Sequence, residues 1–479
     1  MRKEILFLIA KQFWASAFKS KAIYFLLGLM VLLLLYAAYG GIQYHDQNHF
    51  RENHQQMARE SWEANPDKHP HRMAHFGTFA FRMKHPLSTF DFGIESFTGN
   101  VVFLEAHKQN MVNFSEASFS TSLIRFGELS MAMVLQTILP LIIFFIGYTA
   151  VVADRENGTL KILLIQGATW KEILYGKAIG LFSISSLFYL PFALIMVLIL
   201  ITDGHSTSDD WIRLFIVLLT YLLYLAILAM LTMIVSVSSQ SSKNALVKLL
   251  GLWLLFVVVL PRASQAVGSY FHPTPTKLEF KGAIEEEVIQ FGDSHDPNDP
   301  YFTAIRDSVL KVHNVQSIDS LPFNYGGFQM SVGEKISAEI YKSHHGELLN
   351  QYRKQNQWTK LLALVNPYLG VKNLSMTLCG TDLESYVGFQ HQAEDYRYNL
   401  AQTMNELQVK YIKANVSSSE GAVNVVDSKE WESFPNFSYE YPTVGPALQN
   451  ELIAIVSIAC WMLFSVGMMN YWSNKASAL

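Results

Sequence analysis

The sequence predicts an all-α polytopic membrane protein with six transmembrane helices and a mainly helical extracytoplasmic domain. Half of the 479 residues are hydrophobic and only 16% are charged. The resulting mean hydropathy of +0.18 is high for an ordinary soluble protein. The apolar residues gather in six runs that approach the roughly 20 residues needed to cross a bilayer. Between some of these runs lie long polar stretches, parts of which show helical periodicity.

The six apolar runs define the transmembrane helices in chain order. The first run is longer than the apolar core of a usual signal peptide, so we expect a retained anchor rather than a cleaved leader. The fifth run is the shortest, and Lys248 near its end can extend its ammonium to the membrane interface. The predicted spans are residues 22–40, 128–152, 178–201, 214–235, 245–260 and 448–470.

Basic residues in the short flanks set the predicted orientation. Lys and Arg are concentrated before the first span and between the second and third spans, with single lysines at 243 and 475. The positive-inside rule places these flanks and both termini in the cytoplasm. The predicted cytoplasmic segments are then 1–21, 153–177, 236–244 and 471–479, and the predicted extracytoplasmic segments are 41–127, 202–213 and 261–447.

Two segments outside the spans have amphipathic periodicity. In residues 1–21, Ile5, Leu6, Ile9 and neighbouring apolar residues share one helical face, which is typical of a helix lying along the inner membrane surface. The alternative is an ordinary basic flank that only enforces the topology. In the largest outer segment, apolar residues recur at three- and four-residue steps from Tyr386 to Tyr411, so we expect a long helix there and a second one over residues 334–355.

The chain lacks the common catalytic signatures. No P-loop, G-x-S-x-G or H-E-x-x-H motif occurs, so no catalytic residues and no cofactor are expected in this chain. His71 and His75 are spaced to share one face of a helix, as metal ligands can be, and His69 lies close by. No cysteine or evident carboxylate completes a ligand set, so the expectation is no metal site, with His71 and His75 as weak candidates.

Residues 129–153, 178–202, 214–242 and 452–474, which cover most of four spans, contain no Asp, Glu, Lys, Arg or His. Ion-coupled transporters commonly keep such groups in the membrane, so their absence suggests that energy enters from outside the spans. Several polar side chains within or beside these spans are candidates for a transport path, although hydrogen bonds between helices would use the same residues. These pathway candidates are Tyr148, Ser183, Ser186, Tyr189, Tyr221 and Tyr224.

The cytoplasmic segment between the second and third spans reads "ADRENGTLKILLIQGATWKEILYGKAIG". Gly158 precedes "TLKILLI", which can form two helical turns, and Gly167 ends them. "TWKE" matches a capping box in which Thr169 and Glu172 begin a new helix that continues into the third span. The pattern predicts a short crosswise helix that is covalently tied to two spans, so a partner that moved it would move both of them.

This segment resembles the cytoplasmic loop of ABC-2 type permeases, the membrane subunits of ATP-driven exporters. The likeness lies in "RENGTLKILL" and the later "GK", together with the six-span plan and the basic N-terminal helix. The long insert before the last span, with "NPYLGVKNLSM" and "GTDLESY", and "FLEAHKQN" in the first outer segment, resemble one bacterial branch of these permeases. Many members carry a proline after the apolar part of the loop, where this chain has Gln166 and Gly167, which puts the geometry of that turn in question.

The resemblance implies a separate ABC ATPase subunit, which holds ATP and Mg²⁺, and a second permease copy or a paralogue, so homodimer and heterodimer both stay open. It assigns Arg155 and Glu156 to contact with the ATPase or to fixing the loop, and Leu160, Leu163 and Leu164 to a groove of the ATPase. Alternatively, these leucines only rest on the bilayer surface. The implied coupling residues are Arg155, Glu156, Gly158, Thr159, Leu160, Leu163, Leu164, Gly167, Thr169, Glu172 and Lys177.

The sequence therefore favours a permease subunit of an ATP-driven exporter in a bacterial inner membrane, with no enzymatic activity of its own. The lipid bilayer and an envelope or periplasmic protein are expected partners, and nucleic acid is not. The cargo is either a lipid, lipopeptide or similar amphipath, or absent in a machine that only transmits force. Two other classes stay open: a membrane-anchored sensor or scaffold, and a metal-dependent membrane hydrolase resting on the histidines.

Overall fold

The computed structural model is mostly helical, as predicted. It describes residues 1–95, 97–110, 129–292, 294, 296, 298–413 and 424–475. Parts of the predicted segments 41–127, 261–447 and 471–479 lie outside these residues. The helices of the first half are α1 (Lys3–Lys19), α2 (Lys21–Glu63), α3 (Pro70–Phe76), α5 (Met131–Met133), α6 (Leu139–Gly147), α7 (Val152–Glu156), α8 (Thr159–Ile165), α9 (Trp170–Thr202) and α10 (Ser208–Ser238).

The second half is also helical, and the small sheet belongs to the first half. Strands β1 (Thr78–Phe81) and β2 (Val101–Leu104) pair antiparallel, with Thr78 opposite Leu104. This hairpin was not predicted from the sequence. The remaining helices are α11 (Ser242–Leu254), α12 (Leu260–Phe271), α13 (Lys277–Phe291), α14 (Pro300–His313), α15 (Tyr325–Leu362), α16 (Pro367–Leu378), α17 (Leu383–Tyr411), α18 (Lys429–Glu432), α19 (Val444–Asn450) and α20 (Leu452–Lys475).

Within the described residues, six helical segments are long and apolar enough to cross a membrane, which confirms the predicted number. Two of them extend well past the predicted limits: the first continues to Glu63 and the fifth to Phe271. The extension of α2 follows from its sequence, because residues 42–63 contain no proline that would end the helix. The six segments are Lys21–Glu63, Met131–Glu156, Trp170–Thr202, Ser208–Ser238, Ser242–Phe271 and Leu452–Lys475.

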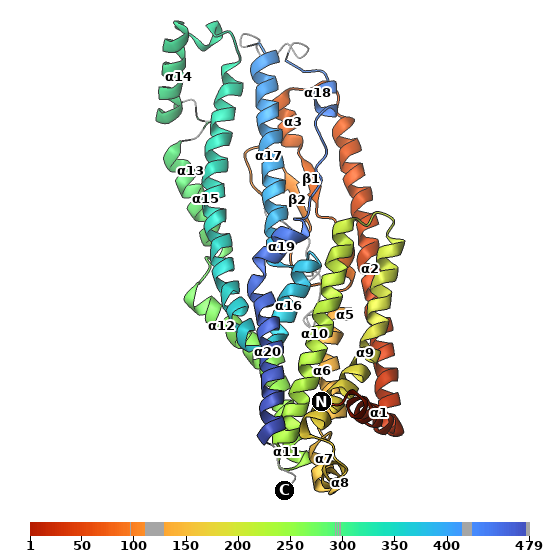
Figure 1. The fold of residues 1–479 in the computed structure, drawn as a ribbon. Coiled ribbons are helices and arrows are strands. Elements are labelled where there is room, and N and C mark those ends of the chain that lie inside the picture. The colour runs from red at the N-terminus through yellow and green to blue at the C-terminus, as the bar shows by residue number, and fades with distance from the viewer. Residues whose placement is uncertain are drawn as a thin grey trace.

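The molecule is elongated, and both ends of the chain lie at the same end of it (Figure 1). The spans form a bundle in which α10 is central and packs on α6, α9, α16 and α20. Tyr221, Tyr224 and Leu225 of α10 are fully buried, because this helix is apolar all round. The distal region, opposite the termini, consists of the end of α2 together with α3, β1, β2, α13, α14, α15, α17 and α18 (Figure 1).

The second and fifth spans each contain one wide helical turn. Residues Val134–Ile138 and Leu255–Val259 are π-helical, and a proline follows each of them at position 140 or 261. A proline has no N–H to donate to the preceding turn, so a local change of helical pitch accommodates it. Pro191, in contrast, lies inside the continuous helix α9.

The N-terminal helix α1 packs against α9 rather than only along a membrane surface. Its buried residues are Leu6, Ile9 and Ala10, on the face that the sequence periodicity indicated. Two glycines of α9 make this contact possible. A Cβ at Gly176 would lie 2.9 Å from Ile9, and a Cβ at Gly180 would lie 3.0 Å from the Ala10 carbonyl. The small residues therefore let the two helix backbones approach closely.

The distal region is built around the long pair α15 and α17. The predicted helix over residues 386–411 is α17, and its buried side chains include Phe389, Ala393, Leu400 and Met404. The predicted second helix, residues 334–355, lies within α15. One face of β1 and β2 packs on α17 through Ala80, Val102 and Leu104. A separate apolar core of the distal region thus continues beyond the membrane bundle.

We expect the distal region to lose stability as the pH falls from about 6.5 to about 4. Burial, and then the nearby charge of His391, lower the pKa of His345 to about 4. The folded state therefore holds this imidazole neutral, while the unfolded chain binds a proton below its ordinary pKa near 6.5. Thermal unfolding followed across this range should show the decline, and His345→Gln should flatten it. An unchanged slope in that variant would contradict the assignment.

Candidate functional site

The segment between the second and third spans contains two short helices, α7 and α8, followed by the start of α9. Two glycines with left-handed backbone shape it: Gly158, with φ of 74°, precedes α8, and Gly167, with φ of 90°, follows it. Nothing lies within 4 Å of a Cβ at either position. The positive φ, rather than crowding, therefore favours glycine at both turns. The predicted two-turn helix over "TLKILLI" is present as α8.

Helix α9 begins with the predicted capping box. The Thr169 hydroxyl accepts from the Glu172 amide at 3.2 Å, and the Glu172 carboxylate accepts from the Thr169 amide at 2.9 Å. Glu172 also binds Arg2, whose Nε and Nη2 donate to its two oxygens at 3.0 and 2.8 Å. Arg2 additionally donates to the Gly167 carbonyl. The N-terminal tail is thus fastened to the end of the loop, a contact the sequence analysis missed because 170 residues separate Arg2 from Glu172.

Arg155 and Glu156 fasten α7 to the turn between α10 and α11. Arg155 donates to the carbonyls of Ser239 and Val237 at 2.9 and 3.0 Å. Glu156 accepts from the amide of Ser242 at 2.9 Å and from its hydroxyl at 2.5 Å. A cation at the end of α10 and an anion at the start of α11 complement the two helix dipoles. These are the contacts expected of residues that fix the loop, one of the two roles that the sequence left open.

Lys177 joins α9 to the end of the second span. Its buried ammonium pairs with the Asp154 carboxylate and donates to the Ala150 carbonyl. Asp154 also accepts from the Thr159 hydroxyl at 3.1 Å. A carboxylate placed between a lysine of α9 and a threonine of α8 links all three helices of the segment. Asp154 was not among the predicted coupling residues, although it contacts two of them, Lys177 and Thr159.

Helix α8 has one buried face and one exposed face. Leu160 is fully buried, and Leu163 and Leu164 pack with it in a small cluster that includes Ile9 and Ile173. The burial of Leu160 does not fit its predicted placement in a partner's groove or on the bilayer surface. Leu163 and Leu164 are only partly buried, so both predicted placements stay predictions for them. The exposed apolar residues are Ile162 and Ile165, of which 55% and 85% of the surface is accessible.

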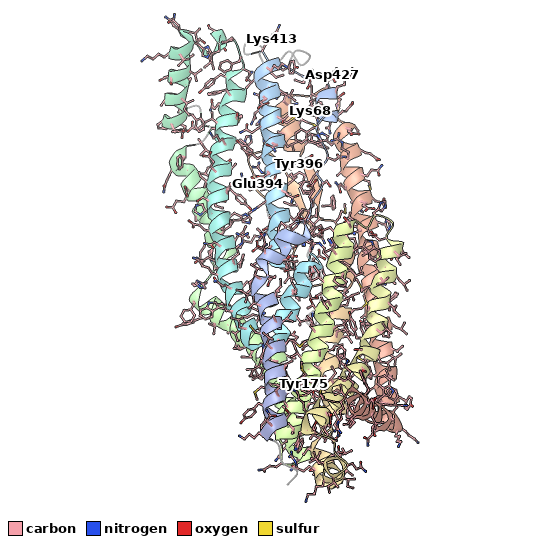
Figure 2. The ribbon with its side chains drawn as sticks, viewed as in Figure 1. Lys68, Tyr175, Glu394, Tyr396, Lys413 and Asp427 are labelled. Atoms are coloured by element: carbon pink, nitrogen blue, oxygen red, sulfur yellow. The ribbon has the colours of Figure 1, made fainter. Side chains whose placement is uncertain are left out.

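The start of α9 also contacts the end of the last span. Tyr175, labelled in Figure 2 near the end of the molecule that holds the termini, donates its hydroxyl to Asn470 at 3.3 Å and to the Val466 carbonyl at 3.4 Å. Helix α9 therefore contacts α1, α10 and α20, and its Ile173 packs in one cluster with Leu160 of α8. A displacement of α8 would act on a helix that is packed against much of the bundle.

The pathway candidates make contacts within and between the helices. Ser183 and Ser186 donate to carbonyls of their own helix at 2.8 and 2.9 Å. Tyr189 donates to the Leu218 carbonyl of α10 at 3.1 Å, and Tyr224 is buried. The half-buried Tyr148 accepts a bond from Ser236 through its carbonyl. The bonds of Tyr189 and Ser236 join two helices, which is the predicted alternative, whereas those of Ser183 and Ser186 stay within α9.

Tyr221 belongs instead to a buried polar cluster where the bundle meets α16. Its hydroxyl binds Gln136 at 2.6 Å and Ser375 at 3.0 Å. Ser375 in turn donates to the Asp91 carboxylate at 2.5 Å. Burial raises the pKa of Asp91, although these hydrogen bonds oppose the shift. The cluster connects α5–α6, α10 and α16 with the segment before Ser96.

Arg213 makes a second connection between the bundle and the chain that leads to the distal region. It is fully buried, donates to the Thr377 and Leu378 carbonyls at 3.3 and 3.2 Å, and also donates to the Pro442 carbonyl. Its Nε pairs with Asp209 at 2.6 Å. One guanidinium at the start of α10 thus holds the end of α16 and the segment before α19. The sequence offered no signal for this role beyond an arginine at the edge of a span.

The candidate metal ligands separate into two groups. His71 and His75 lie together, and His107 joins them from the end of β2. His69 caps α3 instead, where its Nδ1 accepts from the His71 amide at 3.2 Å. The sequence missed His107, because the hairpin of β1 and β2 separates it from the other two.

One family matches part of the chain. Residues 277–440, which begin with α13 and include α15, α16, α17 and α18, match a domain of unknown function, DUF3526. No curated protein matches the chain significantly. The matched residues make up most of the segment between the fifth and sixth spans. The chain is therefore a multi-pass helical membrane protein that carries a DUF3526 domain.

Proposed function

We propose that this chain is the membrane-spanning permease subunit of an ATP-binding cassette exporter. A separate ATPase subunit would dock on residues 153–177. It would bind ATP and Mg²⁺ and hydrolyse the ATP, because the sequence of this chain contains no P-loop. In this proposal both termini are cytoplasmic, the membrane is a bacterial inner membrane, and a second permease copy or paralogue completes the complex. The proposal extends the likeness of "RENGTLKILL" to the ABC-2 type permease loop.

The proposal rests on how α8 is attached to the bundle and on which of its side chains are exposed. Two glycine turns project the helix from the bundle, and Ile162 and Ile165 form an exposed apolar edge on it. Its other face is bound to α1 and α9, while Lys177 and Asp154 link α9 to α7. A helix presented in this way can insert apolar side chains into a partner's groove and pass a displacement to several spans.

Of the two possibilities, transport of an amphipathic cargo or transmission of force without cargo, the packing of the spans favours the second. The pathway candidates serve in helix contacts, and the long helix α2 runs continuously from the terminal end of the bundle into the distal region (Figure 1). The buried contacts of Arg213 connect the bundle with the chain on either side of α17. Movement of the spans would therefore reach the distal region and an envelope partner bound there. A lipid or lipopeptide handled at the membrane surface fits the same arrangement.

Co-purification tests the proposal directly. The tagged chain, expressed with its neighbouring genes and extracted in mild detergent, should bring down a P-loop ATPase and show ATP hydrolysis. Ile165→Glu should weaken that association by roughly 30-fold, the effect of losing a hot-spot contact of about 2 kcal/mol. Ile289→Glu, at a site in α13 that is 77% exposed, is the matched control and should change nothing.

Two outcomes would contradict the proposal. Recovery of the chain without any ATPase, under conditions that preserve other membrane complexes, would favour the membrane-anchored sensor or scaffold. An ATPase that binds Ile165→Glu as tightly as the natural chain would place the docking surface elsewhere. Glu156→Lys provides a further comparison, because it should release the turn at Ser242 and weaken docking by loosening the loop.

A further inference from the structure

Three histidines meet on one side of the distal region. His71 and His75 are one helical turn apart on α3, and His107 follows β2. One ring nitrogen from each lies within 4.8 Å of the other two. The ring centres are separated by 4.7 Å for His71 and His75, 5.6 Å for His71 and His107, and 5.4 Å for His75 and His107. Small rotations of these side chains would bring three nitrogens within the roughly 2.0–2.1 Å bonding distance of one Zn²⁺ ion.

The backbone around the cluster holds α3 and β2 together. The Ala106 amide donates to the Ala74 carbonyl at 3.2 Å, which places His107 beside α3. Met73 and Ala74 are buried in a cluster with Leu400 and Met404 of α17. The histidines thus project from an ordered framework rather than from a loose surface loop. Binding of an ion would require little rearrangement of the chain.

A buried carboxylate orients His107. The Nδ1 of His107 lies 3.1 Å from an oxygen of Glu334, and the same oxygen accepts from the His107 amide at 2.8 Å. The backbone of His107 is left-handed, with φ of 60°, which allows this double contact. An imidazole that donates Nδ1–H to a carboxylate keeps the lone pair on Nε2. Metal-binding histidines in proteins commonly have such a carboxylate behind them.

We propose that His71, His75 and His107 bind one divalent transition-metal ion of the Zn²⁺ class. Three imidazoles suit Zn²⁺, Cu²⁺ or Ni²⁺, whereas Ca²⁺ and Mg²⁺ prefer oxygen ligands. His75 is exposed, so the ion exchanges with the aqueous phase, and the fourth position is left for water or for a group of a partner. This site is independent of the proposed export function and of the ATPase.

Metal analysis of the full chain tests the proposal. The protein should be purified in detergent through an affinity tag without histidine, stripped with a chelator, and dialysed against Zn²⁺. We expect about one equivalent of Zn²⁺ to remain bound. Co²⁺ should give the visible absorption of a protein-bound ion in the same preparation. The double variant His71→Ala with His75→Ala should bind at least about 100-fold more weakly, because it leaves one ligand.

His75→Ala and His313→Ala separate loss of a ligand from loss of folding. His75→Ala alone removes an exposed side chain and should weaken Zn²⁺ binding while leaving thermal unfolding of the metal-free protein unchanged. His313→Ala, an exposed histidine of α14, should bind Zn²⁺ as the natural chain does. Glu334 also pairs with the buried Arg397, so Glu334→Gln is compared only where its thermal unfolding shows it folded; there it should reduce affinity by about 10- to 100-fold through the orientation of His107. Absence of stoichiometric Zn²⁺, or equal binding by the double variant, would overturn the proposal.

Discussion

Replacing Arg397 with methionine should unfold the distal region at markedly lower temperature. Arg397 is buried on α17 and donates to Glu334 at 2.7 Å and to Glu394 at 2.8 and 2.7 Å. Glu394, labelled in Figure 2, lies on the same helix, whereas Glu334 comes from α15. The substitution leaves two acidic groups without their cation in a site shielded from water. Removal of one partner from a buried pair typically costs about 3–5 kcal/mol.

The two carboxylates depend on Arg397 in different ways. Burial raises the pKa of Glu334, but the hydrogen bond from His107 and the charge of Arg397 outweigh it and bring the value to about 2. Burial dominates at Glu394, whose pKa is raised although it is bonded to Arg397. Without the guanidinium, Glu334 would carry an uncompensated buried charge. The free energy of unfolding near neutral pH should therefore fall more than loss of an ordinary hydrogen bond would explain.

An exposed ion pair between the same two helices provides the control. Arg353 of α15 pairs with Glu384 of α17 at 2.8 Å, and 43% of its side chain is accessible to solvent. Because water screens this pair, Arg353→Met should cost less than about 1 kcal/mol. Thermal unfolding in detergent, followed by circular dichroism, compares the two variants. Equal shifts of the two melting temperatures would show that burial of Arg397 contributes nothing special.

The periodic parts of the fold were predictable from the sequence. The six apolar runs predicted the six spans, and the three- and four-residue steps predicted α17. Two glycines and a capping box predicted the limits of α8 and the start of α9. These features depend on neighbours within a few residues, so a single sequence contains them. The hairpin of β1 and β2 was not predicted, because each strand has only four residues and pairs with residues 20 to 26 positions away.

The contacts that define the two candidate sites are long-range, which is why the sequence left them open. Nothing near Glu172 indicates that Arg2 binds it, and nothing near His71 indicates that His107 joins it. The burial of Leu160 was not predicted, for a related reason. In "TLKILLI" both faces contain large apolar residues, so composition alone does not tell which side the protein covers. Packing of α1 against α9 decides that question by covering Leu160.

Leu160→Ala should therefore loosen α8, whereas Ile162→Ala should not. Leu160 is fully buried beside Ile9 and Ile173, and truncation of a buried leucine typically costs about 2–5 kcal/mol. Ile162 is 55% exposed, so its truncation should change stability by less than about 0.5 kcal/mol. The two residues lie in the same short helix and lose comparable apolar volume, which makes them a matched pair.

Limited proteolysis measures this difference in local stability at α8. Lys161 and Lys171 are exposed on either side of Gly167, and trypsin needs an opened backbone to cleave at such positions. Because cleavage follows the population of locally unfolded chain, Leu160→Ala should speed cutting at these lysines by more than tenfold. Ile162→Ala should be cut at the natural rate. If both variants were cut equally fast, α8 would be held by the bilayer or a partner rather than by α1 and α9, and the coupling path from α8 into the bundle would lose its physical basis.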